Sequence, residues 1–339
     1  MQKLSVSIVI PCLNELAYIE KCVRSTQEQT YKEAPISVFV VDGLSTDGTR
    51  EIVKQLSTEY PSVNLIDNPD RFTPKALNLG IEASSTDVVI ILGAHAEIAP
   101  DFVERNVAHL KADKRIGCAG GVIRNVYENE TAEVIGLAMS SPFGVGNARF
   151  RTGGKKGPVD TVAFGAYRRE ALNEIGLFDL DLVRNQDDEL NYRLTKAGWK
   201  IFFDPEIKSE YYVRSSYARL FKQYRQYGYW KVYVNKKHNA VTSVRQLIPF
   251  FFVAYMALAL VVAFIPSIGL SPVVLGAFLW FLAGITATIL VKTPSSKYSG
   301  VLFTFLILHA SYGIGYGQGI WQFLILGKSP SKAGKKLTR

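Results

Sequence analysis

Residues 5–15 read SVSIVIPCLNE, and residues 37–49 read SVFVVDGLSTDGT. In both stretches an apolar, β-branched run ends in a short polar segment containing Pro or Gly, a pattern typical of a buried strand followed by a tight loop. A helix-like sequence follows each of them. Strand, loop and helix in repeated succession predict βαβ units, and therefore an α/β domain with a mostly parallel, Rossmann-like sheet.

The same alternation continues to residue 120. Strands are expected at 6–10, 37–41, 63–66 and 87–92, and helices at 15–29, 49–59, 73–83 and 100–111. In such a sheet, ligands bind beyond the carboxyl ends of the strands. The loops that follow those ends, where we expect a site, cover residues 11–15, 42–48, 67–75 and 93–97.

Residues 121–210 are less regular. A glycine-rich, basic stretch at 144–157 is expected to be a mobile loop, because glycine leaves the backbone many conformations. A strand is expected at 161–166 and a helix at 187–197.

The composition separates two environments along the chain. The 339 residues are 48% hydrophobic and 20% charged, which excludes a disordered or collagen-like chain. The net charge is +9, yet residues 211–339 hold 15 Lys and Arg with no Asp or Glu, which leaves 24 basic and 30 acidic residues in 1–210. Because the basic residues flank long apolar runs, the expected partner is an anionic lipid bilayer and not nucleic acid.

The cysteines and the N-terminus indicate the compartment of the acidic part. Cys12, Cys22 and Cys118 have no CxxC spacing, so a disulfide framework is not expected and a reducing compartment is. The first apolar run is only as long as a strand and lacks the pattern of a signal peptide. We therefore expect the acidic part in the cytosol.

The C-terminal part has the pattern of a membrane region. Residues 217–231 form a basic, aromatic, amphipathic helix that suits either the membrane interface or packing on the first domain. Residues 247–265 and 270–291 carry no charge and are long enough to span a bilayer. The expected division is 1–210 for the catalytic domain, 211–245 for the interfacial helix and linker, 246–326 for the membrane region and 327–339 for a basic tail.

Residues 301–326 leave the number of crossings open, because Gly313, Gly315, Gly317 and Gly319 interrupt an otherwise apolar stretch. The positive-inside rule puts Arg245 and the lysines after the second span on the cytosolic side. A third full crossing would put the basic tail outside, against that rule. The tail residues concerned are Lys328, Lys332, Lys335, Lys336 and Arg339. We expect a multi-pass protein of the inner (plasma) membrane, with a third crossing or a re-entrant segment at 301–326.

Several motifs carry a family resemblance. The pair IVIPCLNE (8–15) and VDGLSTDGT (41–49) resembles the nucleotide-sugar-binding half of family 2 inverting glycosyltransferases, which have the GT-A fold. The resemblance covers residues 5–235 and includes Asn78–Gly80, Phe164–Arg169, Gly176–Asp179 and Gln186–Leu190 with Arg193. Residues 140–151 and 185–194 and the membrane part are most similar to the subfamily of succinoglycan-type exopolysaccharide glucosyltransferases, which act on lipid-linked oligosaccharides.

This resemblance implies roles for individual residues. Asp187 matches the general base, and Gln186 stands where the family usually has Glu. The residues implied in donor binding are Pro11, Asn14, Glu15, Asp42, Arg71, Lys75 and Ala94. Those implied in binding the acceptor or a diphosphate are Arg149, Arg151, Gly165, Ala166, Gln186, Arg193, Gln223 and Arg225. Glu189 is expected to orient Arg193 or the helix, and lipid headgroup anchoring is the alternative role of Gln223 and Arg225.

The metal motif departs from the family. Its Asp-x-Asp falls on Gly93-Ala94-His95, so both carboxylates are missing. The family implies a divalent cation, Mn²⁺ or Mg²⁺, with His95 as a ligand and Glu97 as a second one. Alternatively His95 is a neutral hydrogen-bonding residue, and cationic side chains neutralise the diphosphate. The candidates for that role are Arg71, Lys75, Arg149 and Arg151.

We therefore expect a membrane-anchored inverting glycosyltransferase that moves a hexose from a UDP-sugar to a polyprenyl-diphosphate-linked sugar in surface-polysaccharide assembly, alongside other assembly enzymes. One alternative is a polyprenyl-phosphate sugar synthase. A processive polysaccharide synthase is disfavoured, because its QxxRW signature is only partly matched at Gln226–Trp230. The alternative of another class is a non-catalytic membrane scaffold that binds nucleotide sugars or partner enzymes.

Overall fold

A computed structural model of the chain describes residues 3–213, 215–242 and 244–330. It divides into two compact units, the first made of residues 1–126 and 149–212 and the second of residues 127–148 and 213–339. The sequence-based boundary at 210 lies close to the junction at Tyr212. Residues 127–148 belong to the second unit, which a linear division of the chain does not anticipate. Most of the expected basic tail, residues 331–339, lies outside the described residues.

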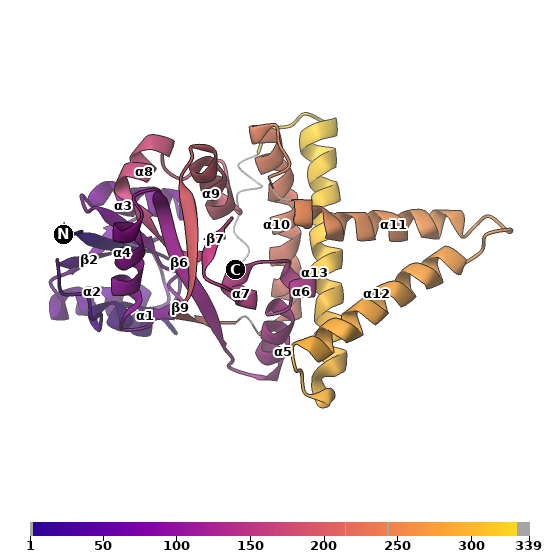
Figure 1. The fold of residues 1–339 in the computed structure, drawn as a ribbon, viewed down its shortest axis with the longest axis horizontal. Helices are drawn as coiled ribbons and strands as arrows, with labels where there is room; N and C mark the ends of the chain where they lie inside the picture. The colour runs from indigo at the N-terminus through magenta and orange to yellow at the C-terminus, as the bar shows by residue number, and fades with distance from the viewer. Residues whose placement is uncertain (1–2, 214, 243, 331–339) are drawn as a thin grey trace. The chain divides into compact units, whose positions relative to one another are not determined.

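The first unit alternates strands and helices. Its strands are β1 (Val6–Cys12), β2 (Ile36–Asp42), β3 (Val63–Asp67), β4 (Val88–Ile91), β5 (Ala96–Ile98), β6 (Ile116–Val126), β7 (Gly157–Val159), β8 (Ala163–Arg168) and β9 (Lys200–Tyr212). Its helices are α1 (Ile19–Gln27), α2 (Thr49–Glu59), α3 (Thr73–Ala83), α4 (Phe102–Ala112), α7 (Arg149–Thr152), α8 (Arg169–Ile175) and α9 (Gln186–Lys196). The expected α/β alternation is confirmed (Figure 1).

One mixed sheet organises this unit. Its order is β3-β2-β1-β4-β8-β6-β9-β5, with β7 paired to β9. Strands β3, β2, β1 and β4 are parallel neighbours, and β8 joins β4 in antiparallel register with Ile90 opposite Ala166. Because β1, β2 and β4 run in the same direction, their carboxyl ends meet at one edge of the sheet.

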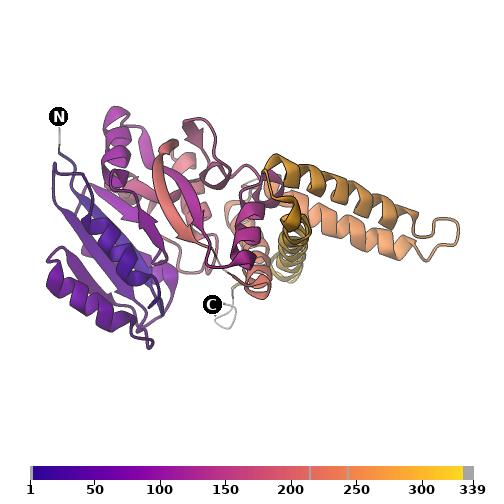
Figure 2. The ribbon, with the colours of Figure 1, turned by 90° about the horizontal axis from the view of Figure 1, so that it is seen from below.

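Helices cover both faces of the sheet (Figures 1 and 2). Ile8 and Ile10 of β1 face one core with α1, α2 and α4, whereas Val9 faces the other with α3, α8 and α9. This alternation is the period of a β-strand buried on both faces, and it explains why the sequence of β1 is apolar at successive positions.

Two expected elements differ from the structure. The helix expected at 15–29 covers only Ile19–Gln27, because residues 15–18 form a separate turn in which the Tyr18 N–H donates to the Glu15 carbonyl oxygen (2.9 Å). Asn14, before this turn, has φ of 53°. The glycine-rich stretch at 144–157 contains the single-turn helix α7, and β7 begins at its end.

The second unit is helical in its described residues. It contains α5 (Glu130–Met139), α6 (Pro142–Val145), α10 (Tyr217–His238), α11 (Ile248–Val262), α12 (Ser271–Leu290) and α13 (Tyr298–Gly319). Short 3₁₀ turns cover Val244–Leu247 and Ser295–Lys297, and a π-helical stretch covers Ile320–Ile325. Residues 127–148 are held in this unit by polar contacts: Lys297 pairs with Glu133 (2.5 Å), and His309 Nε2 lies 2.8 Å from the Phe143 carbonyl oxygen.

Glycines bring α10 and α13 into close contact. A Cβ on Gly315 would lie 2.0 Å from the Arg225 carbonyl oxygen, and one on Gly228 would lie 2.1 Å from the Tyr312 carbonyl oxygen. The glycines of 313–319 therefore do not interrupt the helix. They form the surface on which its neighbours pack, because only a residue without a side chain lets two helix backbones approach so closely.

Three described stretches are long and apolar enough, by length and composition, to cross a membrane: Val244–Val262, Ser271–Leu290 and Ser295–Ile325. They differ in how far the protein itself covers them. In the most apolar 18 residues of each stretch, the share buried by the rest of the protein is 6% for the first, 17% for the second and 61% for the third. Helices α11 and α12 extend as an antiparallel hairpin crosswise to α13 (Figures 1 and 2).

Candidate functional site

The loops after β1 and β2 are tied together by side-chain hydrogen bonds. Asn14 donates its backbone N–H to Ser45 Oγ (2.7 Å), and its side-chain Oδ1 accepts the N–H of Thr46 (2.9 Å). The N–H of Glu15 donates to Thr49 Oγ1 (2.9 Å). Pro11 lies in β1 opposite Val41. The structure thus brings Pro11, Asn14 and Glu15 beside the second loop, and their role in donor binding stays a prediction.

Asp42 ends β2 and is completely buried. Its carboxylate accepts hydrogen bonds from Ser45 Oγ (2.5 Å) and the Ser45 N–H (3.0 Å), and it pairs with Arg50 (2.7 Å). Arg50 also pairs with Asp67 at the end of β3 (2.8 Å). Asp42 therefore organises the loop after β2, and its contact with a nucleoside base stays a prediction.

The two donor-side cations have different surroundings. Arg71 donates from Nε to the Gly43 carbonyl oxygen (2.9 Å) and from Nη2 to that of Leu44 (3.2 Å), so it links the loop after β3 to the loop after β2. Lys75 lies half-buried in the first turn of α3. Arg71 is thus largely occupied by the protein's own carbonyl groups.

His95 follows β4 at the same edge of the sheet. Its Nδ1 lies 3.6 Å from a carboxylate oxygen of Glu15, and its ring meets the edge of Tyr211 with 5.1 Å between ring centres. Ala94, beside it, is buried. Glu97 instead accepts the hydroxyl of Tyr212 (2.5 Å). The structure therefore brings His95 to Glu15 and directs Glu97 toward Tyr212.

Arg151 contacts the same tyrosine as His95. Its guanidinium lies over the ring of Tyr211, 5.3 Å from the centre, and over that of Phe150 at 5.6 Å. Its Nη1 is buried and has no hydrogen-bond partner among the described residues. Arg149, two residues earlier, donates to the Lys155 carbonyl oxygen (3.2 Å). The two arginines, which the sequence gives the same expected role, therefore have different contacts: Arg149 bonds to a backbone oxygen, and Arg151 lies on aromatic rings.

Asp187 lies in the first turn of α9 and is exposed. The positive end of a helix dipole stabilises a carboxylate at this position. Burial, with the Cys118 thiol and the Asp187 carboxylate adding to it, raises the pKa of Tyr167 well above its ordinary value. The neutral phenol then donates to Asn191 Oδ1 (3.0 Å), which fixes α9 against β8.

Gln186 precedes Asp187 in the same turn. Its Oε1 is buried without a hydrogen-bond partner in the described part of the chain. An orphaned buried acceptor is destabilising until a donor reaches it, so this oxygen suits a substrate hydroxyl.

Arg193, on the same helix, has its guanidinium occupied by its own chain. It pairs with the fully buried carboxylate of Glu189 (2.9 Å) and donates to the carbonyl oxygens of Ile175, Gly176 and Leu177, which precede α9. These contacts hold α9 to the turn before it, and Arg193 is paired with Glu189, the residue expected to orient it or the helix. Its predicted contact with the acceptor is not among them.

The remaining predicted residues lie in the sheet or in the second unit. Gly165 and Ala166 are buried in β8, and a Cβ on Gly165 would lie 2.7 Å from Cys118 Sγ. In the second unit, Gln223 donates to the Tyr227 hydroxyl (2.7 Å) and Arg225 to Gln318 Oε1 of α13 (2.8 Å). Their contacts with substrate stay predictions.

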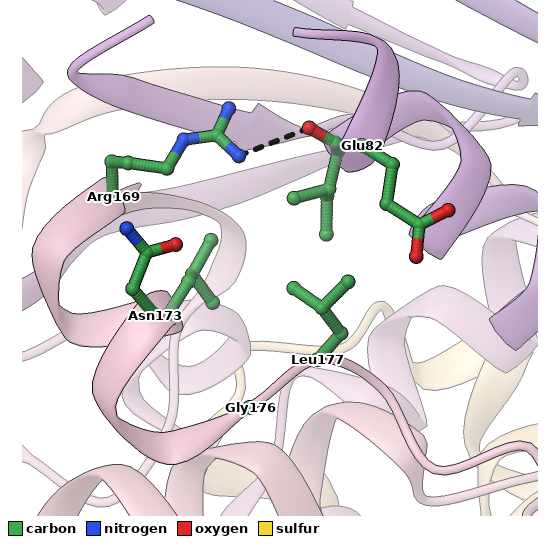
Figure 3. A pocket seen from close by; sticks show the side chains of 7 residues that line it. Glu82, Arg169, Asn173, Gly176 and Leu177 are labelled. Atoms are coloured by element: carbon green, nitrogen blue, oxygen red, sulfur yellow. Dashed lines mark hydrogen bonds between the residues drawn. The ribbon is translucent and has the colours of Figure 1, made fainter. Parts of the chain in front are cut away.

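A separate cavity of about 480 Å³ lies between α3 and α8 (Figure 3). It is lined by Ile81, Glu82, Arg169, Leu172, Asn173, Gly176 and Leu177. Arg169 donates to the Ile81 carbonyl oxygen there (3.0 Å) and so holds α8 to the end of α3. None of the predicted site residues lines this cavity.

Sequence reasoning missed Tyr211 and Tyr212. They end β9, more than a hundred residues after His95, and reach it because β9 pairs with β5, where Ala96 lies opposite Tyr211. The only signal was an aromatic pair at the end of a strand, and that pattern is common in ordinary sheets.

The family can be assigned once this geometry is compared with known proteins. Residues 7–176 match the model of Glycosyl transferase family 2. The chain is also 31% identical over 325 residues to the dolichyl N-acetyl-α-D-glucosaminyl phosphate 3-β-D-2,3-diacetamido-2,3-dideoxy-β-D-glucuronosyltransferase of Methanococcus voltae, covering 93% of this chain and 97% of that protein. The chain belongs to glycosyltransferase family 2.

A second relative of this family 2 chain agrees with that assignment, and a solved structure shares the fold. The succinoglycan biosynthesis protein ExoA of Rhizobium meliloti is 30% identical, with 93% of this chain and 95% of that protein covered. Among solved structures, the mannosyltransferase PcManGT of Pyrobaculum calidifontis superposes with a TM-score of 0.65 at 18% identity, covering 95% of this chain and 88% of that one. That likeness establishes the GT-A fold expected from the sequence.

The family implies a metal, and the mannosyltransferase structure is a complex with GDP-mannose and Mn²⁺. In the described part of the present chain, no three His, Cys, Asp or Glu side chains come together as a metal-binding group. His95 has one carboxylate nearby, that of Glu15. Mg²⁺ and Mn²⁺ favour oxygen ligands and are often held by one or two carboxylates, with substrate phosphates and water as the other ligands. At the motif itself Gly93 and His95 supply no carboxylate, so these residues do not fit the family's metal site.

Proposed function

We propose that this family 2 enzyme is a membrane-anchored inverting transferase that moves a hexose from a nucleoside diphosphate sugar, with UDP as the expected nucleotide, to a polyprenyl-linked sugar. The observation that carries the proposal is the exposed carboxylate of Asp187 at the start of α9, in the same unit as the loops at the carboxyl ends of β1, β2 and β4. A base and a nucleotide site on one rigid scaffold are what sugar transfer to a hydroxyl needs.

Contacts across β8 link helix α9, which carries Asp187, to the loop after β4. Phe164, at the start of β8, lies against Gly93, which follows β4. Thr161, just before β8, accepts a hydrogen bond from Asn191 of α9 (3.2 Å). Helix α9 is therefore attached to the strand that borders the end of β4, and its first turn can serve the same substrate.

The reaction proposed for these residues is a single displacement. Asp187 takes the proton of an acceptor hydroxyl, and that oxygen attacks the anomeric carbon of the donor sugar. The bond from the anomeric carbon to the phosphate oxygen breaks, and its electron pair leaves with the nucleoside diphosphate. Since attack and departure occur on opposite faces, the configuration at the anomeric carbon is inverted. The orphaned Gln186 Oε1 suits a sugar hydroxyl beside this base.

The acceptor is proposed from two observations. The Methanococcus voltae relative is named for a sugar already attached to dolichyl phosphate, and the succinoglycan relative for exopolysaccharide synthesis. The hairpin of α11 and α12 leaves large apolar side chains such as Phe264, Phe278 and Leu290 exposed, which suits contact with lipid. An acceptor held in the bilayer would meet an anchored enzyme at a high local concentration.

The arrangement proposed for the membrane is a hairpin of two crossings, with α13 along the interface. The low burial of the first two apolar stretches suits lipid contact, whereas the third is largely covered and runs crosswise to the hairpin (Figure 1). This arrangement leaves Arg245, Lys292 and Lys328 on one side of the membrane, in agreement with the positive-inside rule. We assign that side to the cytosol of the inner membrane, together with the catalytic domain.

Cysteine labelling in intact cells tests this arrangement. Ser267→Cys, in the turn between α11 and α12, should react with a membrane-impermeant maleimide added outside. Lys328→Cys should react only after the cells are opened, because α13 does not cross. The buried native cysteines provide a low background. Labelling of Lys328→Cys in intact cells would contradict the two-crossing arrangement and favour three.

Transfer to defined lipids tests the function. Purified full-length enzyme would receive radiolabelled UDP-glucose, followed by other nucleotide sugars, with either a polyprenyl-diphosphate-linked sugar or bare polyprenyl phosphate. We expect organic-extractable label only with the sugar-bearing lipid. Label on bare polyprenyl phosphate would instead identify a polyprenyl-phosphate sugar synthase. Nucleotide binding without transfer to any acceptor would instead favour the alternative of a non-catalytic membrane protein that binds nucleotide sugars.

A further inference from the structure

The leaving diphosphate needs a positive charge that the metal motif of this chain does not supply. When the bond to the anomeric carbon breaks, the nucleoside diphosphate gains one negative charge. Preorganised cations that meet charge as it develops lower the barrier to such a step. The cationic side chains proposed from sequence for this task are Arg71, Lys75, Arg149 and Arg151.

The contacts distinguish these four residues. Arg71 donates to backbone carbonyl oxygens of the loop after β2, and Arg149 donates to one in its own loop, so both are held in structural roles. Lys75 lies at the start of α3, and no described contact connects it to His95. Arg151 alone of the four lies on a ring, that of Tyr211, which also contacts the side chain at the metal motif.

Arg151 lies among aromatic side chains and lacks an anionic partner among the described residues. In the described part of the chain, no carboxylate pairs with its guanidinium, whose two recorded contacts are the aromatic faces of Phe150 and Tyr211. A guanidinium over an aromatic ring still has its N–H groups in its own plane, where an acceptor can bind them. The buried Nη1 lacks an acceptor, which is costly until one arrives.

The position of Tyr211 selects the donor side over the acceptor side. His95, on one side of this ring, lies 3.6 Å from Glu15 of the first donor loop. Arg151, on the same ring, is thereby connected to the loops that follow β1 and β4. A planar guanidinium forms two parallel hydrogen bonds to a phosphate, so this side chain is suited to a diphosphate at that edge.

We propose that Arg151, stacked on Tyr211 beside His95, binds the diphosphate of the nucleotide donor and neutralises it as it leaves, in the place of a metal ion. This inference rests on the proposed function, since it assumes a nucleoside diphosphate leaving group. Tyr211 acts as a positioning residue that carries Arg151.

Equilibrium binding tests the inference without turnover. Isothermal titration of the full-length enzyme in nanodiscs, in EDTA, would compare UDP with uridine, and GDP and dTDP with their nucleosides. For the nucleotide that binds, Arg151→Met should weaken diphosphate binding about 10- to 100-fold, the size expected for losing a charge-assisted pair. Nucleoside binding should not change. Arg115→Met, which removes an exposed arginine of the same unit that pairs with Asp113, should stay within about threefold, and Arg151→Lys should recover part of the loss.

The outcomes separate the inference from the proposed function. Unchanged diphosphate affinity in Arg151→Met, or a loss in Lys75→Ala instead, would overturn the role of Arg151. So would wild-type binding that is absent in EDTA and restored by Mn²⁺. If Arg151→Met weakens farnesyl diphosphate and not the nucleotide, the residue serves the acceptor and the inference is wrong. If no nucleoside or nucleotide binds to any form, the proposed donor site itself fails.

Discussion

Asp187→Asn should lower sugar transfer about 1,000-fold and leave nucleotide binding intact. Proton removal by a positioned base contributes roughly 10²- to 10⁴-fold to a reaction of this kind, and an amide cannot accept the proton. The substitution keeps the size and shape of the side chain, so the first turn of α9 should not change. Initial rates with a polyprenyl-linked sugar, together with the Kd of the nucleotide diphosphate, would measure the two effects separately.

Asp188→Asn is the matched control, because it removes the same charge one residue further along the helix. We expect its rate to fall less than tenfold. Substantial activity in Asp187→Asn would point to an acceptor that is already ionised, such as a lipid phosphate, and would argue against transfer to a sugar hydroxyl. Loss of nucleotide binding in the same variant would instead indicate a structural role for Asp187.

Gly315→Ala should destabilise the second unit by about 2–3 kcal/mol, although alanine is the better helix former. The added Cβ would lie 2.0 Å from the Arg225 carbonyl oxygen, which belongs to the backbone of α10 and cannot rotate away. The two helices must therefore separate, at the cost typical of overpacking a close contact. Thermal unfolding of the purified protein in detergent, followed by near-UV circular dichroism, would measure the change.

Gly317→Ala, two residues further along α13, supplies the comparison. Its added Cβ would lie 3.6 Å from the ring of Phe250, which is an ordinary contact. Because alanine favours a helix by about 1 kcal/mol over glycine, this variant should match or exceed the wild type in stability. Equal melting temperatures in the two variants would mean that the close approach of α10 and α13 does not limit stability.

The local pattern of the sequence was enough for the framework of the first unit. Helices α2 and α3 have the predicted bounds, and β1, β2, β3 and β4 lie within two residues of theirs. The period of apolar residues and the turn residues after each strand depend on near neighbours in the chain, so they can be read directly. The motifs at 8–15 and 41–49 lie on adjacent parallel strands, and the family they resemble is the one to which the chain belongs.

The roles of the charged side chains depended on contacts between distant residues. Arg193 pairs with buried Glu189 and with carbonyl groups of a preceding turn, whereas Arg151 stacks on Tyr211, sixty residues away in the chain. A sequence shows that a charge is present but not which partner neutralises it. That choice depends on which strands pair and which loops meet.

In the membrane part, too, the sequence predicted some features and the packing of the helices decided others. Length and absence of charge identified the hairpin of α11 and α12 from the sequence. The glycines of α13 suggested a break, because glycine weakens a helix that stands alone. In the folded unit they are contacts between helices, since Gly313 packs on the Pro249 carbonyl and Gly315 on that of Arg225. Composition determined which segments are apolar, and only the packing of their neighbours decided which of them would be covered.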